Sequence, residues 1–195
     1  MKLFRVIFFS AVVFCNSYAQ NLTQSYGGKV GFYDPSGGLN NGLLLGIDGI
    51  TEFNNYNFFL SGALDLYYKK SIDIFNEPKP TVTDQQVFIL PLHANFGYKV
   101  FQVPDADTKL YAGIGGGYYF YFYNVNYFGG GIVPLEASAS PNGGNLFFSV
   151  FTRILIGKIF LEPRYYVAIS EEDRIEEYNY EIDPSGFAIT IGFEY

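Results

Sequence analysis

The last nine residues of the chain alternate strictly between two kinds of side chain. Large apolar residues stand at every second position, namely Phe187, Ile189, Ile191, Phe193 and Tyr195, and the residues between them are small or polar. A period of two is the period of a β-strand, whose side chains point alternately to opposite faces of a sheet. The segment therefore predicts a C-terminal strand with one apolar face and one polar face.

The same alternation recurs along the chain and predicts eight strands. They cover residues 24–33, 42–51, 56–68, 85–98, 108–123, 145–157, 158–170 and 186–195. Most exceed the roughly 9–11 residues that a tilted strand needs to cross a bilayer. No segment after residue 19 is apolar for long enough to form a membrane-spanning helix, and a sheet in lipid has to close into a barrel to satisfy its backbone.

Pro91 and Pro163 fall within strands, where we expect a bulge or a strand end because proline lacks the N–H donor.

Residues 1–19 have the pattern of a secretory signal peptide. A basic start is followed by an apolar core ending at Cys15 and by small residues up to Ala19. Lipidation of Cys15 is an alternative, although Phe14 before it fits that signal poorly. Cleavage after Ala19 would leave a single domain, residues 20–195, without cysteine, so we expect neither a disulfide nor a thiolate metal site.

The mature chain is acidic and rich in aromatic residues. Loss of Lys2 and Arg5 with the signal peptide leaves ten basic and 19 acidic residues, a net charge of −9. This charge argues against nucleic acid as a partner, because nucleic-acid binding needs a basic surface. The 18 Tyr, 21 Phe and 22 Gly of the chain are typical of strands and of membrane interfaces.

Charged residues on the polar faces of the strands would line the lumen of such a barrel. These residues are Lys29, Asp48, Asp65, His93, Arg153, Glu162, Arg164 and Glu194. An eight-stranded barrel is just wide enough for side chains to fill it, and buried charges are costly unless they pair. We therefore predict a salt-bridged polar plug. Arg153, Glu162 and Arg164 flank the Gly157–Lys158 turn, so pairing across this hairpin is easy.

A narrow channel or a small hydrophobic-ligand carrier is an alternative interpretation of the lumen. Gly113, Gly115 and Gly117 share an inward face, where they clear space for neighbouring Tyr and Arg side chains or permit sharp coiling of the strand. A channel would need a continuous cavity lined by these glycines with Tyr119, Ser149 and His93. A soluble lipocalin-like barrel is a further alternative, but its outer face should be polar.

His93, the single histidine, raises the possibility of a hydrolase. Its partners would be a serine, Ser61 or Ser149, and a lumen carboxylate, Asp65 or Glu162. In outer-membrane lipid A deacylases the serine follows the histidine by two positions on the lipid-facing side. Here Asn95 takes that position and His93 faces the lumen, so we predict no catalytic residue and no enzyme activity.

The connections between the predicted strands alternate in length. Every second connection is long and polar, and most of the others are short turns. Bacterial barrels have long outer loops and short periplasmic turns, so both termini are expected in the periplasm. The loops at residues 124–144 and 171–185 are candidate contact sites for a surface ligand. The second loop is acidic but lacks the spaced carboxylates of a calcium loop, and we predict neither a metal nor a cofactor.

The whole mature chain resembles the small outer-membrane β-barrel domain family of Gram-negative bacteria, which includes porin-like and opacity-type proteins. The resemblance rests on LPLHANF at residues 90–96, YAGIGGG at 111–117, FLEPRY at 160–165 and the terminal Tyr195. It implies an all-β, eight-stranded antiparallel up-and-down transmembrane β-barrel in the outer membrane, in contact with lipid and lipopolysaccharide. It also implies a structural or surface-interaction role in the envelope, and that Ile191, Phe193 and Tyr195 are read by the barrel-assembly machinery.

Overall fold

The computed structural model describes much of the chain after the predicted signal peptide. The described residues are 22–36, 39, 41–75, 81–129, 136–139, 142–175 and 178–195. The signal peptide predicted at residues 1–19 lies outside them. Within the described part of the chain, no helix is long and apolar enough to cross a membrane.

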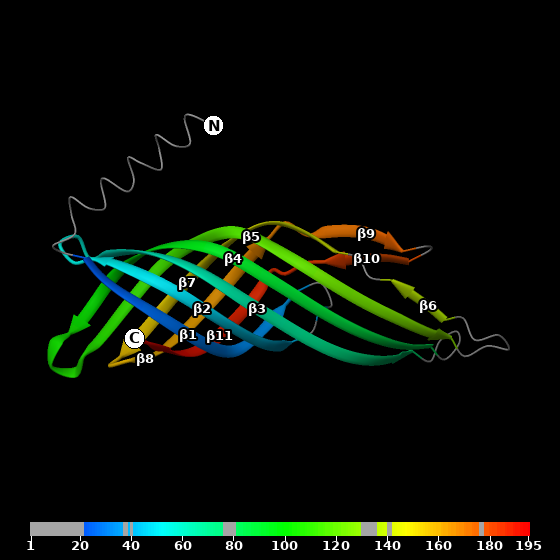
Figure 1. Ribbon diagram of the computed structural model, residues 1–195, viewed down its shortest axis with the longest axis horizontal. Helices are drawn as coiled ribbons and strands as arrows, with labels where there is room; N and C mark the ends of the chain where they lie inside the picture. The colour runs from blue at the N-terminus through cyan, green and yellow to red at the C-terminus, as the bar shows by residue number, and fades with distance from the viewer. Residues whose placement is uncertain are drawn as a thin grey trace, which may run out of the picture.

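Eight antiparallel strands of the described chain close into a barrel (Figure 1). They are β1 (Leu22–Pro35), β2 (Gly42–Phe53), β3 (Phe58–Phe75), β4 (Thr81–Val103), β5 (Thr108–Gly129), β7 (Asn142–Ile156), β8 (Ile159–Ala168) and β11 (Gly186–Glu194). Each strand pairs with its neighbours in the sequence of barrel strands, and β1 pairs with β11 to close the circle. The predicted eight-stranded up-and-down barrel is therefore confirmed.

The two ends of the barrel differ in their connections. One end carries short turns at residues 54–57, at η2 (Pro104–Ala106) and at 157–158, and we call it the turn end. The C-terminus lies there (Figure 1). The other, the loop end, carries three short strands in regions predicted as loops: β6 (Glu136–Ala139), β9 (Glu171–Ile175) and β10 (Tyr178–Ile182). Strand β6 pairs with β5, and β9 pairs with β10.

Side chains alternate between the outside and the lumen, as the sequence pattern predicts. Along β7, the outward Phe148 and Val150 are 66% and 56% exposed, whereas the inward Phe151 and Arg153 are buried. The other barrel strands follow the same rule, so large exposed apolar residues make up most of the outer face. The large apolar residues that alternate along the strands predicted at 56–68, 85–98, 145–157 and 158–170 point outward.

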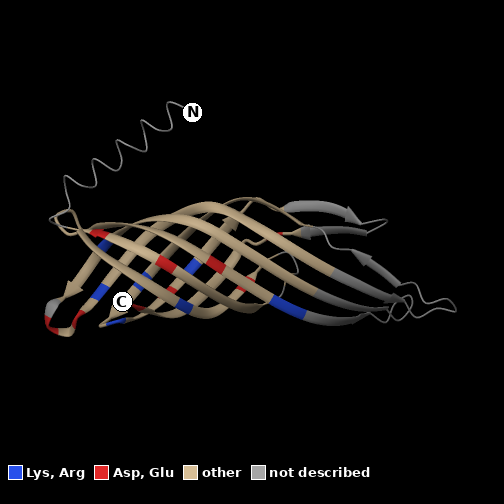
Figure 2. Ribbon diagram, in the orientation of Figure 1, with Lys and Arg blue, Asp and Glu red and all other residues tan. Residues whose placement is uncertain are grey.

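Two apolar clusters fill the lumen, one toward each end. The cluster at the loop end contains Tyr33, Tyr67, Tyr119, Phe147 and Tyr166 with their neighbours. The cluster at the turn end contains Ile50, Phe59, Tyr111, Phe151, Leu155 and Phe160. Between the two clusters, about midway along the barrel, charged residues lie on the strands (Figure 2).

Glycines on the lumen face of β5 make room for these side chains. A Cβ atom at Gly113 would overlap the ring of Phe151, and one at Gly115 would overlap Asn95 and Ser149 and lie 3.2 Å from Arg164 Nη1. The prediction that a glycine of this face clears space for an arginine is thus confirmed at Gly115. At Gly113 the neighbour is a phenylalanine rather than a tyrosine.

The expectation of a bulge or strand end at the two prolines is wrong. Pairing between β3 and β4 is interrupted opposite Pro91 and resumes in the same register, and pairing between β7 and β8 behaves likewise opposite Pro163. Each proline keeps its pairing with the strand on its other side, Pro91 with Tyr119 and Pro163 with Ile189. A missing N–H removes a bond toward one neighbour only, so the strand continues. The register shift found between β4 and β5 lies elsewhere, at Lys99 and Phe101.

We predict that Gly115→Val destabilises the barrel by about 1–3 kcal/mol, because the added side chain overpacks the lumen. The matched control is Gly28→Val, at an outward glycine with no atom within 4 Å of the new Cβ, and its effect should stay within about 0.5 kcal/mol. Urea unfolding of both refolded variants, followed by circular dichroism, measures the difference. Equal stabilities would contradict the close packing around Gly115.

Candidate functional site

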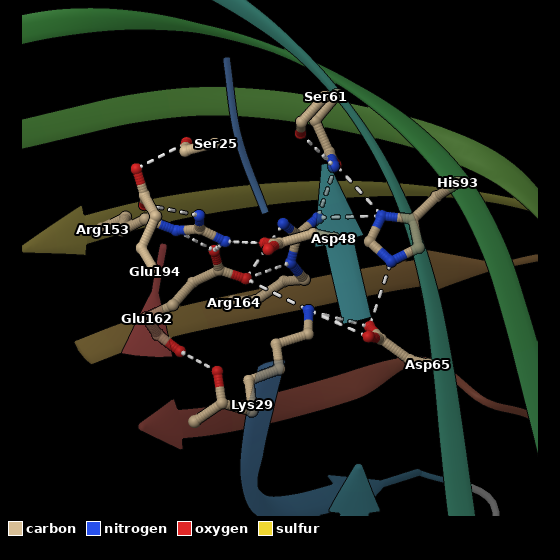
Figure 3. Close-up of polar contacts among 12 residues, drawn as sticks. Ser25, Lys29, Asp48, Ser61, Asp65, His93, Arg153, Glu162, Arg164 and Glu194 are labelled. Atoms are coloured by element: carbon tan, nitrogen blue, oxygen red, sulfur yellow. Dashed lines mark hydrogen bonds and ion pairs between the residues drawn. The ribbon is translucent and has the colours of Figure 1, made fainter. Parts of the chain in front are cut away.

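The candidate site is the charged network in the middle of the lumen. The structure places all eight residues predicted for it on inward positions (Figure 3). They come from β1 (Lys29), β2 (Asp48), β3 (Asp65), β4 (His93), β7 (Arg153), β8 (Glu162, Arg164) and β11 (Glu194). Seven strands thus contribute charged or titratable side chains, and β5 contributes the glycines that make room for them.

Arg153 connects three carboxylates toward the turn end. Its Nε donates to Glu162 Oε2 at 2.8 Å, and its Nη2 donates to Asp48 and lies 2.6 Å from Glu162 Oε2. Its Nη1 is 3.7 Å from Glu194 Oε2. The guanidinium also lies over the ring of Phe160, 4.1 Å from its centroid. A buried arginine with this many partners is held in one orientation.

Glu162 is the acceptor that the cations share. Besides Arg153, it accepts from Arg164 Nε at 3.1 Å and lies 3.0 Å from Arg164 Nη2. Lys29 Nζ is 3.6 Å from its Oε1. Its side chain is only 1% exposed, so these partners replace the water that the carboxylate loses.

Asp65 forms a second centre toward the loop end. Lys29 Nζ lies 2.9 Å from Asp65 Oδ1, His93 Nε2 lies 3.0 Å from Oδ2, and the Tyr166 hydroxyl donates to Oδ2 at 3.0 Å. Lys29 therefore joins the two centres, because its ammonium contacts both Asp65 and Glu162.

Asn95 links the histidine to the arginine. Arg164 Nη1 donates to Asn95 Oδ1 at 2.8 Å, and His93 Nδ1 is 3.1 Å from the same oxygen. The amide Nδ2 donates to Ser61 at 3.0 Å, and Arg164 also donates to Ser149 at 2.8 Å. Asn95, Ser149 and Tyr166 belong to the network although they were not predicted to be part of it. Their inward positions on β4, β7 and β8 were the signal that could have included them.

The hydrolase arrangement is not formed by these residues. His93 contacts Asp65, Asn95 and Arg164, whereas the two candidate serines contact Asn95 and Arg164. A nucleophilic serine has to lie within hydrogen-bond reach of its base. Across the residues with described side chains, no group of three or more His, Cys, Asp or Glu is arranged to hold a metal ion.

The two mouths of the lumen are closed by side chains. At the loop end, the hydroxyls of Tyr33, Tyr67 and Tyr119 donate to the backbone carbonyls of Pro184, Leu39 and Ile169, and the side chains of Leu39 and Ile182 are buried in the cluster below. At the turn end, Glu52 accepts from Tyr111 and from Lys109 Nζ at 3.3 Å. The cavity that a channel would need along Gly113, Gly115 and Gly117 is therefore occupied by packed side chains.

Solved structures with a similar fold are small outer-membrane proteins. A major outer-membrane protein of Thermus thermophilus aligns with a TM-score of 0.52 at 8% identity, over 89% of this chain and 100% of that one. Ail of Yersinia pestis (TM-score 0.47, 11% identity, 89% and 97% covered) and OprG of Pseudomonas aeruginosa (0.47, 10%, 88% and 95%) also align. The fold is that of a small eight-stranded outer-membrane β-barrel. No protein-family model and no curated protein sequence matches the chain.

Removal of the Lys29 ammonium should be strongly destabilising. Lys29→Met removes the lysine ammonium that lies 2.9 Å from the buried Asp65 carboxylate and should cost about 3–5 kcal/mol. In a double-mutant cycle, Lys29→Met with Asp65→Asn should cost less than the sum of the single variants by about 0.5–3 kcal/mol. Urea unfolding in detergent micelles measures all three.

The matched control for this cycle is Lys99→Met. Lys99 Nζ lies 4.0 Å from Glu52 Oε2 at the turn-end mouth. When Lys99 is removed, Glu52 keeps Lys109 Nζ at 3.3 Å and the Tyr111 hydroxyl, so this variant should cost about 1 kcal/mol. If Lys29→Met cost no more than Lys99→Met, the buried network would not be what stabilises the barrel.

Proposed function

We propose that the chain is an integral protein of a bacterial outer membrane, with both termini in the periplasm. The outward faces of all the barrel strands are apolar, and this supports lipid rather than water as the surrounding solvent. Exposed aromatic residues stand near both ends of the barrel, as at the two interfaces of a bilayer. Tyr26, Tyr56, Tyr98 and Tyr195 lie toward the turn end, and Tyr68, Phe88, Phe120 and Phe122 toward the loop end.

The proposed role is non-enzymatic and acts through the barrel wall and the loops. The observation that carries it is the filled lumen, in which an ion-paired layer lies between two apolar clusters. A barrel plugged in this way has no path for solutes and no open site for a substrate. What remains accessible is the lipid-facing wall and the surface at the loop end, which suits support of the envelope or contact with surface partners.

The proposed partners follow from this placement. The barrel wall would contact outer-membrane lipid and lipopolysaccharide, and the loops at 124–144 and 171–185 would present the surface ligand site. Ile191, Phe193 and Tyr195 point outward at the end of the chain and are 54%, 50% and 81% exposed. This exposure supports their proposed role as the signal that the barrel-assembly machinery reads.

A charge on the outer wall distinguishes a membrane barrel from a soluble one. Val150→Arg, at an outward residue that is 56% exposed, should cost about 2–4 kcal/mol in lipid vesicles, because the charge would lie in hydrocarbon. Gln102→Arg, at an exposed position near the turn end, is the control and should cost about 0–1 kcal/mol. Urea unfolding from vesicles provides both values. An equal, small cost at the two positions would favour a soluble barrel.

Conductance measurements test the plug. We expect the purified chain to migrate differently on gels with and without boiling, as a stable barrel does, and to give no stepwise current in planar bilayers. The reason is that two apolar clusters and the ion-paired layer block the lumen. Discrete current steps from protein that shows this shift on gels would overturn the non-conducting role and restore the channel alternative.

A further inference from the structure

The ring of His93 is buried between two oxygen atoms. Its Nε2 lies 3.0 Å from Asp65 Oδ2, and its Nδ1 lies 3.1 Å from Asn95 Oδ1. The side chain of His93 is 0% exposed, so both ring nitrogens depend on these neighbours. Which of the nitrogens carries a proton therefore follows from what each neighbour can donate or accept.

The amide of Asn95 presents its oxygen to His93. Arg164 Nη1 lies 2.8 Å from the same atom, and a guanidinium nitrogen only donates, so the shared atom is the acceptor oxygen. On its other side the amide nitrogen of Asn95 donates to Ser61 at 3.0 Å. Nδ1 of His93 faces an acceptor and has to carry a proton to bond with it.

Arg164 does not donate to the ring in place of that bond. Its Nη1 is 3.4 Å from His93 Nδ1, but the shorter contacts to Asn95 Oδ1 and to Ser149, both 2.8 Å, take the two hydrogens of this nitrogen. Its Nε and Nη2 meet Glu162 at 3.1 Å and 3.0 Å. The positive charge of Arg164 is thus paired with Glu162, which limits its repulsion of a charged ring.

Asp65 is an acceptor on the opposite side of the ring (Figure 3). Lys29 Nζ lies 2.9 Å from Asp65 Oδ1, and the Tyr166 hydroxyl donates to Oδ2 at 3.0 Å. Both contacts favour the ionised carboxylate, which only accepts. A neutral ring would leave one bare nitrogen against an oxygen of Asp65 or Asn95, whereas the imidazolium form donates to both.

The charge balance of the lumen network agrees with an imidazolium. Its four carboxylates, Asp48, Asp65, Glu162 and Glu194, face three permanent cations, Lys29, Arg153 and Arg164. The lysines of the turn-end mouth, Lys99 and Lys109, contact Glu52 instead. An unbalanced negative charge inside an apolar wall is costly, and a protonated His93 cancels it.

The remaining groups around the ring are uncharged. The ring of Phe147 on β7 lies 5.7 Å from that of His93, and the ring of Tyr166 on β8 lies 6.4 Å from it, measured between centroids. On the two strands paired with β4, the residues opposite His93 are Ala63 and Gly117. Asp65, Lys29 and Arg164 are thus the charged groups that decide the state of the ring.

We propose that His93 is a proton-binding site, which holds an imidazolium in the folded barrel as the fourth cation of the lumen. A histidine in the unfolded chain releases its proton above about pH 6.5, so folding in neutral or alkaline solution takes up one proton. Stability is therefore lost as the pH rises. The site goes beyond the proposed role of the outer surface and does not depend on the membrane location.

Nitrogen NMR of the single histidine tests the proposal directly. The mature chain is produced without a histidine tag, labelled with ¹⁵N-histidine and reconstituted in lipid at about pH 8, where an unperturbed histidine is neutral. We expect two ring nitrogens with similar chemical shifts, each bonded to a proton. Two widely separated shifts, the signature of a neutral ring, would overturn the proposal, and this measurement needs no variant.

The pH dependence of unfolding provides the second test. Above about pH 7 the unfolding equilibrium constant of the natural chain should rise by up to tenfold per pH unit, as release of one proton requires. His93→Gln binds no proton and should lack this rise. Tyr166→Phe is the matched control, because it removes a hydroxyl from Asp65 but keeps both acceptors of His93. It should lower stability and retain the rise. Parallel pH profiles for the natural chain and His93→Gln would contradict a proton held at His93.

Discussion

The pairing of buried charges is the constraint on which this barrel depends. Three cations and four carboxylates lie inside an apolar wall, with side chains that are at most 10% exposed. Isolated charges in such a place would cost far more than the stability of a small protein. The network offsets this cost because one carboxylate contacts several cations, as Glu162 contacts Arg153, Arg164 and Lys29. The arrangement fixes which strands face one another across the lumen, since its partners come from opposite sides of the barrel.

The filled lumen is the main structural support for the proposed role of the outer surface. Apolar clusters lie on either side of the charged layer, and the hydroxyls of Tyr33, Tyr67 and Tyr119 tie loop-end segments down onto the mouth. The described side chains of this interior could bind or react only after breaking several buried contacts. Under the proposed function, interaction with the surroundings is left to the outer wall and to the surface at the loop end.

Alternation along the sequence was enough to predict the barrel and the direction of each lumen residue. The parity of a residue, meaning its odd or even place along the strand, decides which face it is on. Parity assigns His93, Arg153 and Glu162 to the inside whatever the neighbouring strands do. Parity cannot say which of them meet, because contacts across the lumen depend on how far each strand is staggered against the next. Asn95 shows this limit: it faces inward by parity, yet its position between His93 and Arg164 follows only from the register.

The two prolines connect the backbone with the charged network. Asp65 lies directly opposite Pro91 in the register of β3 and β4, and Glu162 immediately precedes Pro163 on β8. At both places the cross-strand pairing is interrupted, and at both a buried carboxylate gathers the cations of the lumen. Arg153 and Glu162, which the register of β7 and β8 sets opposite one another at the second gap, are joined through their side chains instead. Side-chain bonds between neighbouring strands, Arg153–Glu162 on β7 and β8 and His93–Asp65 on β3 and β4, thus connect the strands where their backbone pairing is interrupted, which helps a closed sheet to tolerate proline in the middle of two strands.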